Sequence, residues 1–555
     1  MSQPRIVVLG AGTAGLKAAA RARRLLPTAA ITVVDRRSFI SYDPCGLPYF
    51  LGGDVPEVED LRRTNYGAIR DADWFARTRE IEVLCGYEVL GIDRDKRAVS
   101  LRAVADESRH MLMYDHLVYA LGSRPHVPDG IRPGAAVACG GSPDAIAALG
   151  AGLRTGEVDH VAVLGAGLMG LEIAGVLRER WQIDVTLVEA ASQVLPAVLD
   201  PEMARLVEGH LRRAGVTLRL DAAVTSATTE QGRAQVVLEG GETLAADRAV
   251  VALGVRPETS LAAATGLALG DARGLVVDAN LRTSDPDILA AGDCIELVHH
   301  VTGAIGVLPM GSLASRQGRV AGDVLAGRDA EFGAVVGSLA VQAADLNAAA
   351  TGLTEHAARE AGFAVESAWG VFNDRSVFHP EQQKLYLKVV YEEGCQRLVG
   401  LQAVGLGDVT KRVDVFASLL RQDAALEDLL DVEWCYSPPF NAALDPLHGL
   451  AAAALNACGD PVGQHAPCAD VDRCTVVDVR TVAEFEGDEA SAWPEVTNLP
   501  LEDLRGRLAD LPDGDVVVVC AKGPRSVEAA RLIVARRGGR VRYLAGGVEF
   551  ARFLR

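Results

Sequence analysis

Residues 5–26 read RIVVLGAGTAGLKAAARARRLL, and this stretch decides the fold of the N-terminal half. An apolar run enters a glycine-rich turn, and an alanine-rich segment follows it. Gly10 permits a tight turn, Gly12 a close approach of the backbone to a pyrophosphate, and Gly15 close packing of helix on strand. A second apolar run, ITVVD, ends at Asp35, placed for a ribose hydroxyl. The order predicts a dinucleotide-binding strand–helix–strand unit.

The same pattern recurs in residues 160–177, HVAVLGAGLMGLEIAGVL. Gly165, Gly167 and Gly170 repeat the glycine spacing, and the following run DVTLVE ends at Glu189. Two such units predict two dinucleotides. A carboxylate at position 189 suits a free 2′-hydroxyl and repels a 2′-phosphate. NADH is therefore favoured, and NADPH is the alternative.

The bulk composition limits the function classes. A chain of 555 residues predicts several domains, and its formal charge of −19 argues against nucleic acid and anionic membrane partners. The sequence has no apolar run of 18 or more residues, so we expect no membrane span. The N-terminus enters a strand-like run without a secretory signal, so we expect a cytoplasmic protein. In that compartment the 10 cysteines are expected to be thiols.

One cysteine lies in a loop made rigid by glycine and proline. Residues 41–53 read SYDPCGLPYFLGG and contain Cys45, while a C-x4-C partner is absent because position 50 is Phe50. A catalytic Cys45 must then exchange with an external group and rest as a mixed disulfide, a persulfide or a sulfenic acid. The alternative is a buried structural cysteine.

Three later segments complete a recognisable order: YALGSRP (119–125), VALGVRP (251–257) and TSDPDILAAGDC (283–294). With the two glycine turns they resemble the two-dinucleotide flavoprotein disulfide reductases. The cysteine loop resembles the single-cysteine branch of that family, which includes coenzyme A-disulfide reductases, NADH oxidases and persulfide or sulfur reductases. The resemblance implies an α/β fold with FAD at the first turn, NADH at an inserted second one, and an α+β dimerisation domain. The implied cofactor-binding residues are Gly10, Gly12, Thr13, Ala14, Gly15, Asp35, Arg36, Val89, Ala120, Gly122, Asp293, Gly165, Gly167, Leu168, Met169, Gly170, Glu189 and Gly254.

Basic side chains follow the first glycine turn at helical spacing. Lys17, Arg21 and Arg24 fall at i, i+4 and i+7, on one helix face. The resemblance implies that this face and Ser41 line a channel for the phosphates of coenzyme A, a candidate ligand. We expect Arg62 and Arg63 to contribute to the same site. A solvated basic face is the alternative.

The segment YSPPF (436–440) resembles part of the family's dimerisation domain. The resemblance implies a homodimer in which Tyr436 reaches the partner's active site as a proton donor. The segment VFHPE (377–381) departs from the tyrosine-rich turn of the coenzyme A-disulfide and persulfide reductases. Phe378 and His379 occupy the tyrosine positions, so the acid is either His379 or Tyr436.

The C-terminal segment VVVVCAKGPRSVEAARLI (516–533) predicts a buried strand, a loop and a helix. The tail resembles a single rhodanese domain, an α/β fold, with the six-residue loop that sulfurtransferases use. Amides of the loop, the helix dipole, Lys522 and Arg525 are expected to stabilise a thiolate or persulfide on Cys520.

Three cysteines near the start of the tail have the spacing C-x9-C-x5-C. That spacing suits zinc poorly, and we predict no metal site. The expected domains are FAD-binding (1–118 and 251–330), NAD(H)-binding (119–250), dimerisation (331–457), a linker (458–472) and rhodanese (473–555).

The predicted function is FAD-dependent reduction, by NADH, of persulfide, polysulfide or coenzyme A disulfide, with a sulfurtransferase module. The alternatives are an NADH oxidase that cycles through a Cys45 sulfenic acid and a flavin-based redox sensor.

Overall fold

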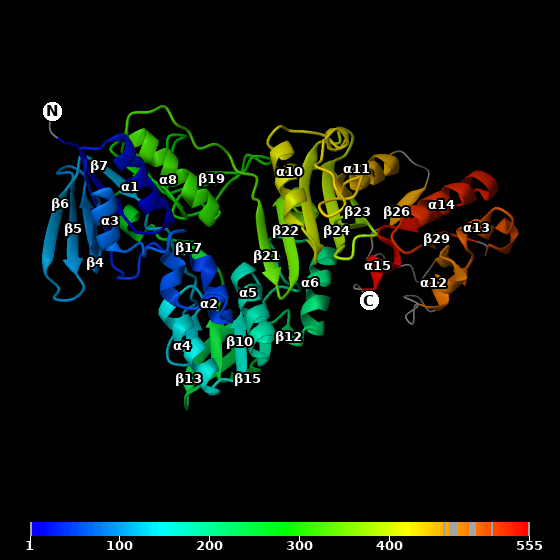
Figure 1. Cartoon of the computed structure of the whole chain (residues 1–555), viewed down its shortest axis with the longest axis horizontal. Helices are drawn as coiled ribbons and strands as arrows, with labels where there is room; N and C mark the ends of the chain where they lie inside the picture. Colours follow the sequence, from blue (N-terminus) through cyan, green and yellow to red (C-terminus); the bar gives the residue numbers. More distant parts are fainter. Residues whose placement is uncertain (1–2, 459–461, 466–473, 488–495, 512–513, 553–555) are drawn as a thin grey trace. The chain divides into compact units, whose positions relative to one another are not determined.

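The computed structural model describes residues 3–458, 462–465, 474–487, 496–511 and 514–552. The chain contains both helices and strands, and between residues 82 and 139 the strands follow one another with no described helix between them (Figure 1). Two compact units divide the chain, one of Met1–Thr186 and Val224–Val335, the other of Leu187–Ala223 and Val336–Arg555. Most of the predicted linker 458–472 lies outside the described residues. Of the helices that are described, none has the length and apolar content to cross a membrane.

A five-stranded sheet forms the core of the first unit, and all four of its strand pairs are parallel. Its strands, in spatial order, are β18 (Ile288–Ala290), β7 (His116–Tyr119), β1 (Arg5–Leu9), β2 (Ala30–Asp35) and β3 (Glu82–Cys85). Ile6, Val8 and Leu9 of β1 are fully buried. A central parallel strand is covered on both faces, which explains why this stretch is a continuous apolar run.

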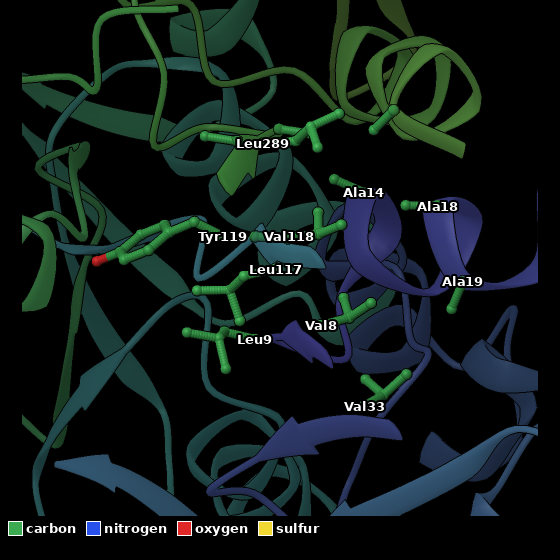
Figure 2. Packing of buried hydrophobic residues seen from close by; sticks show 14 of the residues in the cluster. Val8, Leu9, Ala14, Ala18, Ala19, Val33, Leu117, Val118, Tyr119 and Leu289 are labelled. Atoms are coloured by element: carbon green, nitrogen blue, oxygen red, sulfur yellow. The ribbon is translucent and has the colours of Figure 1, made fainter. Parts of the chain in front are cut away.

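Helix α1 (Thr13–Leu25) packs closely against helix α8 (Gly311–Leu325). A Cβ added to Gly318 of α8 would lie 2.4 Å from the carbonyl oxygen of Ala14, so the two helices approach through small residues. Figure 2 shows the buried cluster beneath them, which combines α1 with the sheet and includes Val8, Ala14, Ala18, Ala19, Val118 and Leu289. This packing sets the position of the N-terminus of α1.

The second glycine turn repeats the strand–turn–helix arrangement in the first unit. Strand β10 (His160–Leu164) leads through the turn into helix α5 (Leu168–Val176). Parallel neighbours follow in the order β10, β16 (Arg248–Val251) and β9 (Val137–Cys139). Two antiparallel sheets accompany these units: β4 (Tyr87–Asp93), β5 (Ala98–Ala103) and β6 (Arg109–Met113), and β13 (Val224–Glu230), β14 (Arg233–Leu238) and β15 (Thr243–Ala246).

An antiparallel sheet forms the first layer of the second unit. Its strands, in spatial order, are β21 (Leu339–Ala343), β22 (Leu346–Gly352), β25 (Leu398–Gly405), β24 (Lys384–Glu392) and β23 (Val365–Asn373). The helices in contact with it include α6 (Pro201–Arg213), α9 (Glu355–Glu360), α10 (Thr410–Leu420), α11 (Pro446–Ala457) and α15 (Gly547–Ala551).

A buried ion cluster ties α6 and α9 to this sheet. The ammonium of Lys388, on β24, lies 2.8 Å from Asp200, 2.5 Å from Glu202 and 2.7 Å from Glu355. Gln402 donates to Asp200, and the indole of Trp369 donates to Glu202. Among the described residues these three acids are the one group that is close enough to hold a metal ion, and the Lys388 ammonium lies within contact distance of all three.

A parallel sheet forms the C-terminal part of the second unit. Its strands, in spatial order, are β26 (Gly463–His465), β30 (Val541–Leu544), β29 (Val516–Val519), β27 (Thr475–Asp478) and β28 (Val496–Asn498). Helix α14 (Pro524–Arg537) follows β29 after a short loop, and helix α12 (Val482–Glu486) follows β27. The four residues of β29 are all buried, as the valine run predicts.

Candidate active site

The first glycine turn forms a cradle for a phosphate. Gly10 has a φ of +102°, and a Cβ there would lie 2.2 Å from the oxygen of Ala120. A Cβ on Gly15 would lie 2.0 Å from the oxygen of Gly10. Around Gly12, in contrast, nothing lies within 4 Å of an added Cβ. The outer glycines therefore serve packing, and the middle one leaves open the space in which a pyrophosphate can approach the N-terminus of α1.

Asp35 ends β2 beside this cradle and is buried. Its carboxylate accepts the N–H of Ala11 at 2.9 Å and two hydrogen bonds from the guanidinium of Arg37. Burial raises its pKa, but the contacts with Arg37 outweigh burial, so the net pKa is lowered and the carboxylate stays ionised. Sequence reasoning named Arg36, which is exposed, and missed Arg37.

The AAGD segment completes the first cradle. Asp293 accepts a hydrogen bond from the hydroxyl of Ser123 at 2.8 Å, and burial raises its pKa. The amide of Gly292 donates to Gln317 at 2.7 Å, which connects this segment to α8. Gly122, next to Ser123, has a φ of +68°. Of the other expected cofactor residues, Ala120 is buried, and Val89 on β4 is partly exposed.

The second cradle has the same internal geometry. Gly165 has a φ of +106°, and a Cβ on Gly170 would lie 1.9 Å from the oxygen of Gly165. No atom lies within 4 Å of a Cβ added to Gly167, the N-cap of α5. The expected residues Leu168 and Met169 start α5. Of the other positions expected to bind cofactor, Gly254 has a φ of +87°, and Glu189 follows strand β11 (Asp184–Val188). Thr13, expected at the first cradle, is the first residue of α1.

Cys45 lies on a single 3₁₀ turn, η1 (Pro44–Gly46), which leads into helix α2 (Leu47–Gly52). The turn is capped by Asp43, whose side chain accepts the N–H of Cys45 at 3.1 Å. The thiol is exposed. Partial loss of water contact, and then the negative charges of Asp43, Glu172 and Asp293, raises the pKa of Cys45 to about 11. A thiolate here therefore needs an electron-poor or cationic neighbour.

Glu172 is the residue near Cys45 that sequence reasoning missed. It lies on α5, directly after the second glycine turn, and burial raises its pKa to about 7. The charges of Glu172 and Asp293 both act on the Cys45 thiol. The sulfur thus lies within electrostatic reach of both glycine-turn units. The available signal was a lone acid in the apolar helix LMGLEIAGV.

The predicted basic stripe on α1 divides in the structure. Arg21 forms an ion pair with Asp323 of α8 at 2.6 Å, and both side chains are largely buried. Lys17 lies against Gly318, whereas Arg24 is exposed. Arg21 therefore contributes to helix packing, and Arg24 is the most accessible charge of the three.

Ser41 and Arg62, two further candidates, are connected through Arg70, which sequence reasoning did not name. Arg70 donates to the carbonyl oxygens of both residues, at 3.2 and 3.1 Å. The guanidinium of Arg62 lies 4.6 Å from the ring centre of Phe39. Ser41 is buried and adopts a φ of +59°, an uncommon conformation for a residue with a side chain. The structure thus places Ser41 and Arg62 in one small network.

Tyr436 lies in the second unit and is 54% exposed. It lines a pocket of about 400 Å³ together with Phe372, Asn373, Phe378, Leu444 and Lys522. His379 is not among the residues of that pocket. Its Nδ1 instead accepts the amide of Glu381 at 3.3 Å. Of the two candidate acids, Tyr436 is therefore the one that faces a cavity.

Cys520 directly follows strand β29 and is almost fully buried, at 1% exposure. The amide of Gly523 donates to its sulfur at 3.1 Å. A Cβ on Gly547 would lie 2.2 Å from the oxygen of Cys520, which shows how tightly the loop is packed. The two basic residues expected to act here have other partners: Arg525 binds Glu484, and the ammonium of Lys522 donates to Asn373.

Comparison with known proteins gives three family matches along the chain. Residues 4–307 match the pyridine nucleotide-disulphide oxidoreductase model, and residues 340–447 match the dimerisation domain of the same family. Residues 464–550 match the rhodanese-like domain.

Individual relatives cover most or all of the chain. An NAD(P)H sulfur oxidoreductase (CoA-dependent) from Pyrococcus furiosus is 30% identical over 81% of this chain and 99% of its own length. An NADH oxidase from Methanocaldococcus jannaschii is also 30% identical, over 81% of this chain and 98% of its own. Among solved structures, an NAD-dependent persulfide reductase from A. fulgidus has a TM-score of 0.94 at 36% identity, covering 98% of this chain and 99% of that one. Bacillus anthracis CoADR-RHD has a TM-score of 0.90 at 30% identity, covering 100% and 98%.

Proposed function

The chain belongs to the pyridine nucleotide-disulphide oxidoreductase family, and from that premise we propose that it reduces persulfides, polysulfides or coenzyme A disulfide with electrons from NADH. The rhodanese-like domain supplies a sulfurtransferase module. One observation carries the proposal: the exposed thiol of Cys45 is within electrostatic reach of Asp293 from the first glycine-turn unit and Glu172 from the second.

The two cradles fit FAD and NADH in that order. The open space over Gly12 and the aspartates Asp35 and Asp293 suit the pyrophosphate, ribose and ribitol of FAD. Gly167 offers the same approach to NADH, with Glu189 on the adenosine ribose. When bound, FAD carries an electron pair from NADH to sulfur. NADPH remains the alternative donor.

The chemistry at Cys45 proceeds by thiol–disulfide exchange. The thiolate of Cys45 attacks the inner sulfur of a persulfide R–S–S–H, which forms Cys45–S–S–R and releases hydrosulfide. Two electrons and one proton then cleave that disulfide, which restores the Cys45 thiolate and releases R–SH. We assign the proton to Tyr436 of the partner subunit in a cytoplasmic homodimer. The match to a dimerisation domain and the exposure of this tyrosine support that assignment.

We also propose the division into domains given by the sequence: 1–118 with 251–330, 119–250, 331–457, 458–472 and 473–555. The pairing of β18 with β7 in one parallel sheet supports the split first domain. Coenzyme A is the proposed carrier of the sulfur. Ser41 and Arg62 support a site for its phosphates, because Arg70 joins them in one cationic network and Ser41 belongs to the Cys45 loop. The exposed Arg24 is proposed as a further contact.

The test is the substitution Cys45→Ser in protein that retains its flavin. We expect anaerobic, NADH-dependent release of sulfide from a small organic persulfide to fall by at least about a thousandfold, because the attacking thiolate is gone. Cys395→Ser is the matched control, since it removes an exposed thiol far along the sequence. Near-normal turnover by the flavin-loaded Cys45→Ser protein would contradict the proposal.

NADH oxidase activity is the second candidate, because the relative from Methanocaldococcus jannaschii carries that name and Phe378 replaces a tyrosine. In that reaction Cys45 would cycle through a sulfenic acid. Oxygen consumption at saturating NADH, compared with sulfide release under argon, separates the two. We expect the sulfide rate to be the greater; a greater oxygen rate would favour the oxidase.

A further inference from the structure

The arginine next to the rhodanese cysteine is already occupied. The two terminal nitrogens of Arg525 donate to the two carboxylate oxygens of Glu484, at 2.7 and 2.8 Å. Glu484 is held in that orientation, because it also accepts the amide and the hydroxyl of Thr481 in the capping box of α12. Both terminal nitrogens of the guanidinium that would bind an anion are therefore already hydrogen-bonded.

The lysine of the loop is also directed elsewhere. The ammonium of Lys522 donates to Asn373 on β23 at 2.8 Å and lines the pocket of about 400 Å³. Arg375 also lines the pocket, but it pairs with Asp374 and Glu381. Most of the other lining residues are apolar, with Phe372, Val377 and Leu444 among them. This pocket beside the loop suits an organic group better than a small inorganic dianion.

The donor in direct contact with the Cys520 sulfur is neutral, although the paired guanidinium of Arg525 still acts electrostatically on the thiol. The amide of Gly523 contacts the sulfur, and the hydroxyl of Ser526 is fully buried with no hydrogen-bond partner among the described residues. Ser526 precedes Ala529, Ala530 and Ile533 on one face of α14, and those three pack in the same core cluster as Cys520. Neutral donors of this kind suit the single charge of a perthiolate. They do not offset the double charge of thiosulfate.

We propose that Cys520 takes its sulfur from an organic persulfide, and that Glu484 disfavours thiosulfate by occupying Arg525. This inference rests on the proposed sulfurtransferase role. In the favoured step the Cys520 thiolate attacks the outer sulfur of R–S–S–H. A new S–S bond forms, the old one breaks, and R–S⁻ leaves, so Cys520–S–S–H is the product. With thiosulfate the same attack would release sulfite, which requires two negative charges to approach beside Glu484.

The test compares two donors with cyanide as the acceptor and thiocyanate as the measured product. The donors are 2-mercaptoethanol persulfide and thiosulfate, and the full-length protein is used. In Glu484→Gln we expect the ratio of kcat/KM for thiosulfate to kcat/KM for persulfide to rise about tenfold, because one repelling charge is lost and the Arg525 fork becomes available. Glutamine preserves the capping box, so the helix should form.

Glu486→Gln is the matched control, since it removes the same charge from the last residue of α12. We expect its donor ratio to stay within about twofold of the wild type, because Glu486 is exposed and its charge is screened by salt. The wild-type enzyme should also keep its persulfide rate when thiosulfate is added at millimolar concentration.

Two failures can be told apart. If the wild type forms no thiocyanate from either donor, the sulfurtransferase role itself is wrong. If it uses both donors equally well, if thiosulfate inhibits persulfide turnover, or if Glu484→Gln leaves the ratio unchanged, the role stands and the selection by Glu484 is overturned.

Discussion

Replacing Lys388 by methionine should strongly destabilise the second unit. The Lys388 side chain is 1% exposed, and its ammonium contacts three carboxylates at 2.5–2.8 Å. Methionine has a similar length but no charge, so the substitution leaves Asp200, Glu202 and Glu355 facing one another in a buried space. Breaking a buried ion pair from one side costs about 3–5 kcal/mol. For a unit of this size that corresponds to a fall in Tm of about 10 °C.

The effect depends on pH in a definite direction. Burial raises the pKa of Asp200 and of Glu355, but the charge and hydrogen bonds of Lys388, together with the other contacts of these carboxylates, outweigh burial and lower both. In the wild type their contribution to stability is therefore present above about pH 4 and is lost as the pH falls through the lowered folded pKa values. Without Lys388, burial dominates and raises these pKa values. The stability of the variant relative to the wild type should then rise as the pH falls from 8 to 5.

The assay is the Tm of the wild type, Lys388→Met and Lys384→Met, each followed by circular dichroism between pH 5 and pH 8. Lys384 pairs with Glu549 in a partly exposed position, so its loss should cost only about 0–1 kcal/mol. The reasoning is refuted if Lys388→Met melts as the Lys384→Met control does. It is also refuted if the gap to the wild type does not narrow at pH 5.

Three further outcomes follow from the two cradles. Glu189→Arg should shift the kcat/KM ratio of NADPH to NADH upward by at least about tenfold, because a repelled phosphate gains a partner; an unchanged ratio would remove Glu189 from coenzyme selection. Glu172→Gln should abolish a transition near pH 7 in the rate of Cys45-dependent turnover, because the carboxyl has a pKa of about 7 and gains its charge as the pH rises through that value; a profile that keeps this transition would assign it to another group. Gly170→Ala should weaken NADH binding by about tenfold or more, because its Cβ would lie 1.9 Å from a carbonyl oxygen. The control Gly141→Ala has nothing within 4 Å of its Cβ and should bind NADH as the wild type does. Equal dissociation constants for the two variants, measured by fluorescence titration, would contradict the packing argument.

Local patterns were enough to predict the two cradles. A central parallel strand is apolar throughout, the glycines follow it at fixed spacing, and the acid ends the next strand, so Gly10, Gly15 and Asp35 are recognisable within about thirty residues. The family resemblance supplied the order of the domains and the cysteine loop around Cys45. The glycine turns, the acid and the cysteine loop are each formed by residues that are close in sequence, which is why a local pattern reveals them.

Partners that are distant in sequence could not be predicted in this way. Arg21 is 302 positions from Asp323, and nothing in the spacing of the basic stripe indicates that one member is paired. Glu172 looked like an ordinary helix residue, because its proximity to Cys45 depends on how α5 is placed. Arg525 and Glu484 come from different helices, so the sequence indicated a free cation where the structure has an ion pair. Side-chain pairing between elements follows from tertiary packing, which periodicity does not encode.

The sheet that holds the first cradle also has a consequence for the order in which the newly made chain can fold. Strand β18 completes that sheet beside β7, yet it emerges from the ribosome only after about 290 residues have been made. At about 5–20 residues per second, some 15–60 s pass after β1 has been made. Strand β7 is made partway through that interval, and about 170 residues, or some 8–34 s, separate it from β18. During this time β7 presents an unpaired edge, which is a hazard for aggregation. Strand β16, which pairs with β10, is synthesised before β18, so the strands that flank the second cradle are available before the sheet of the first can be completed.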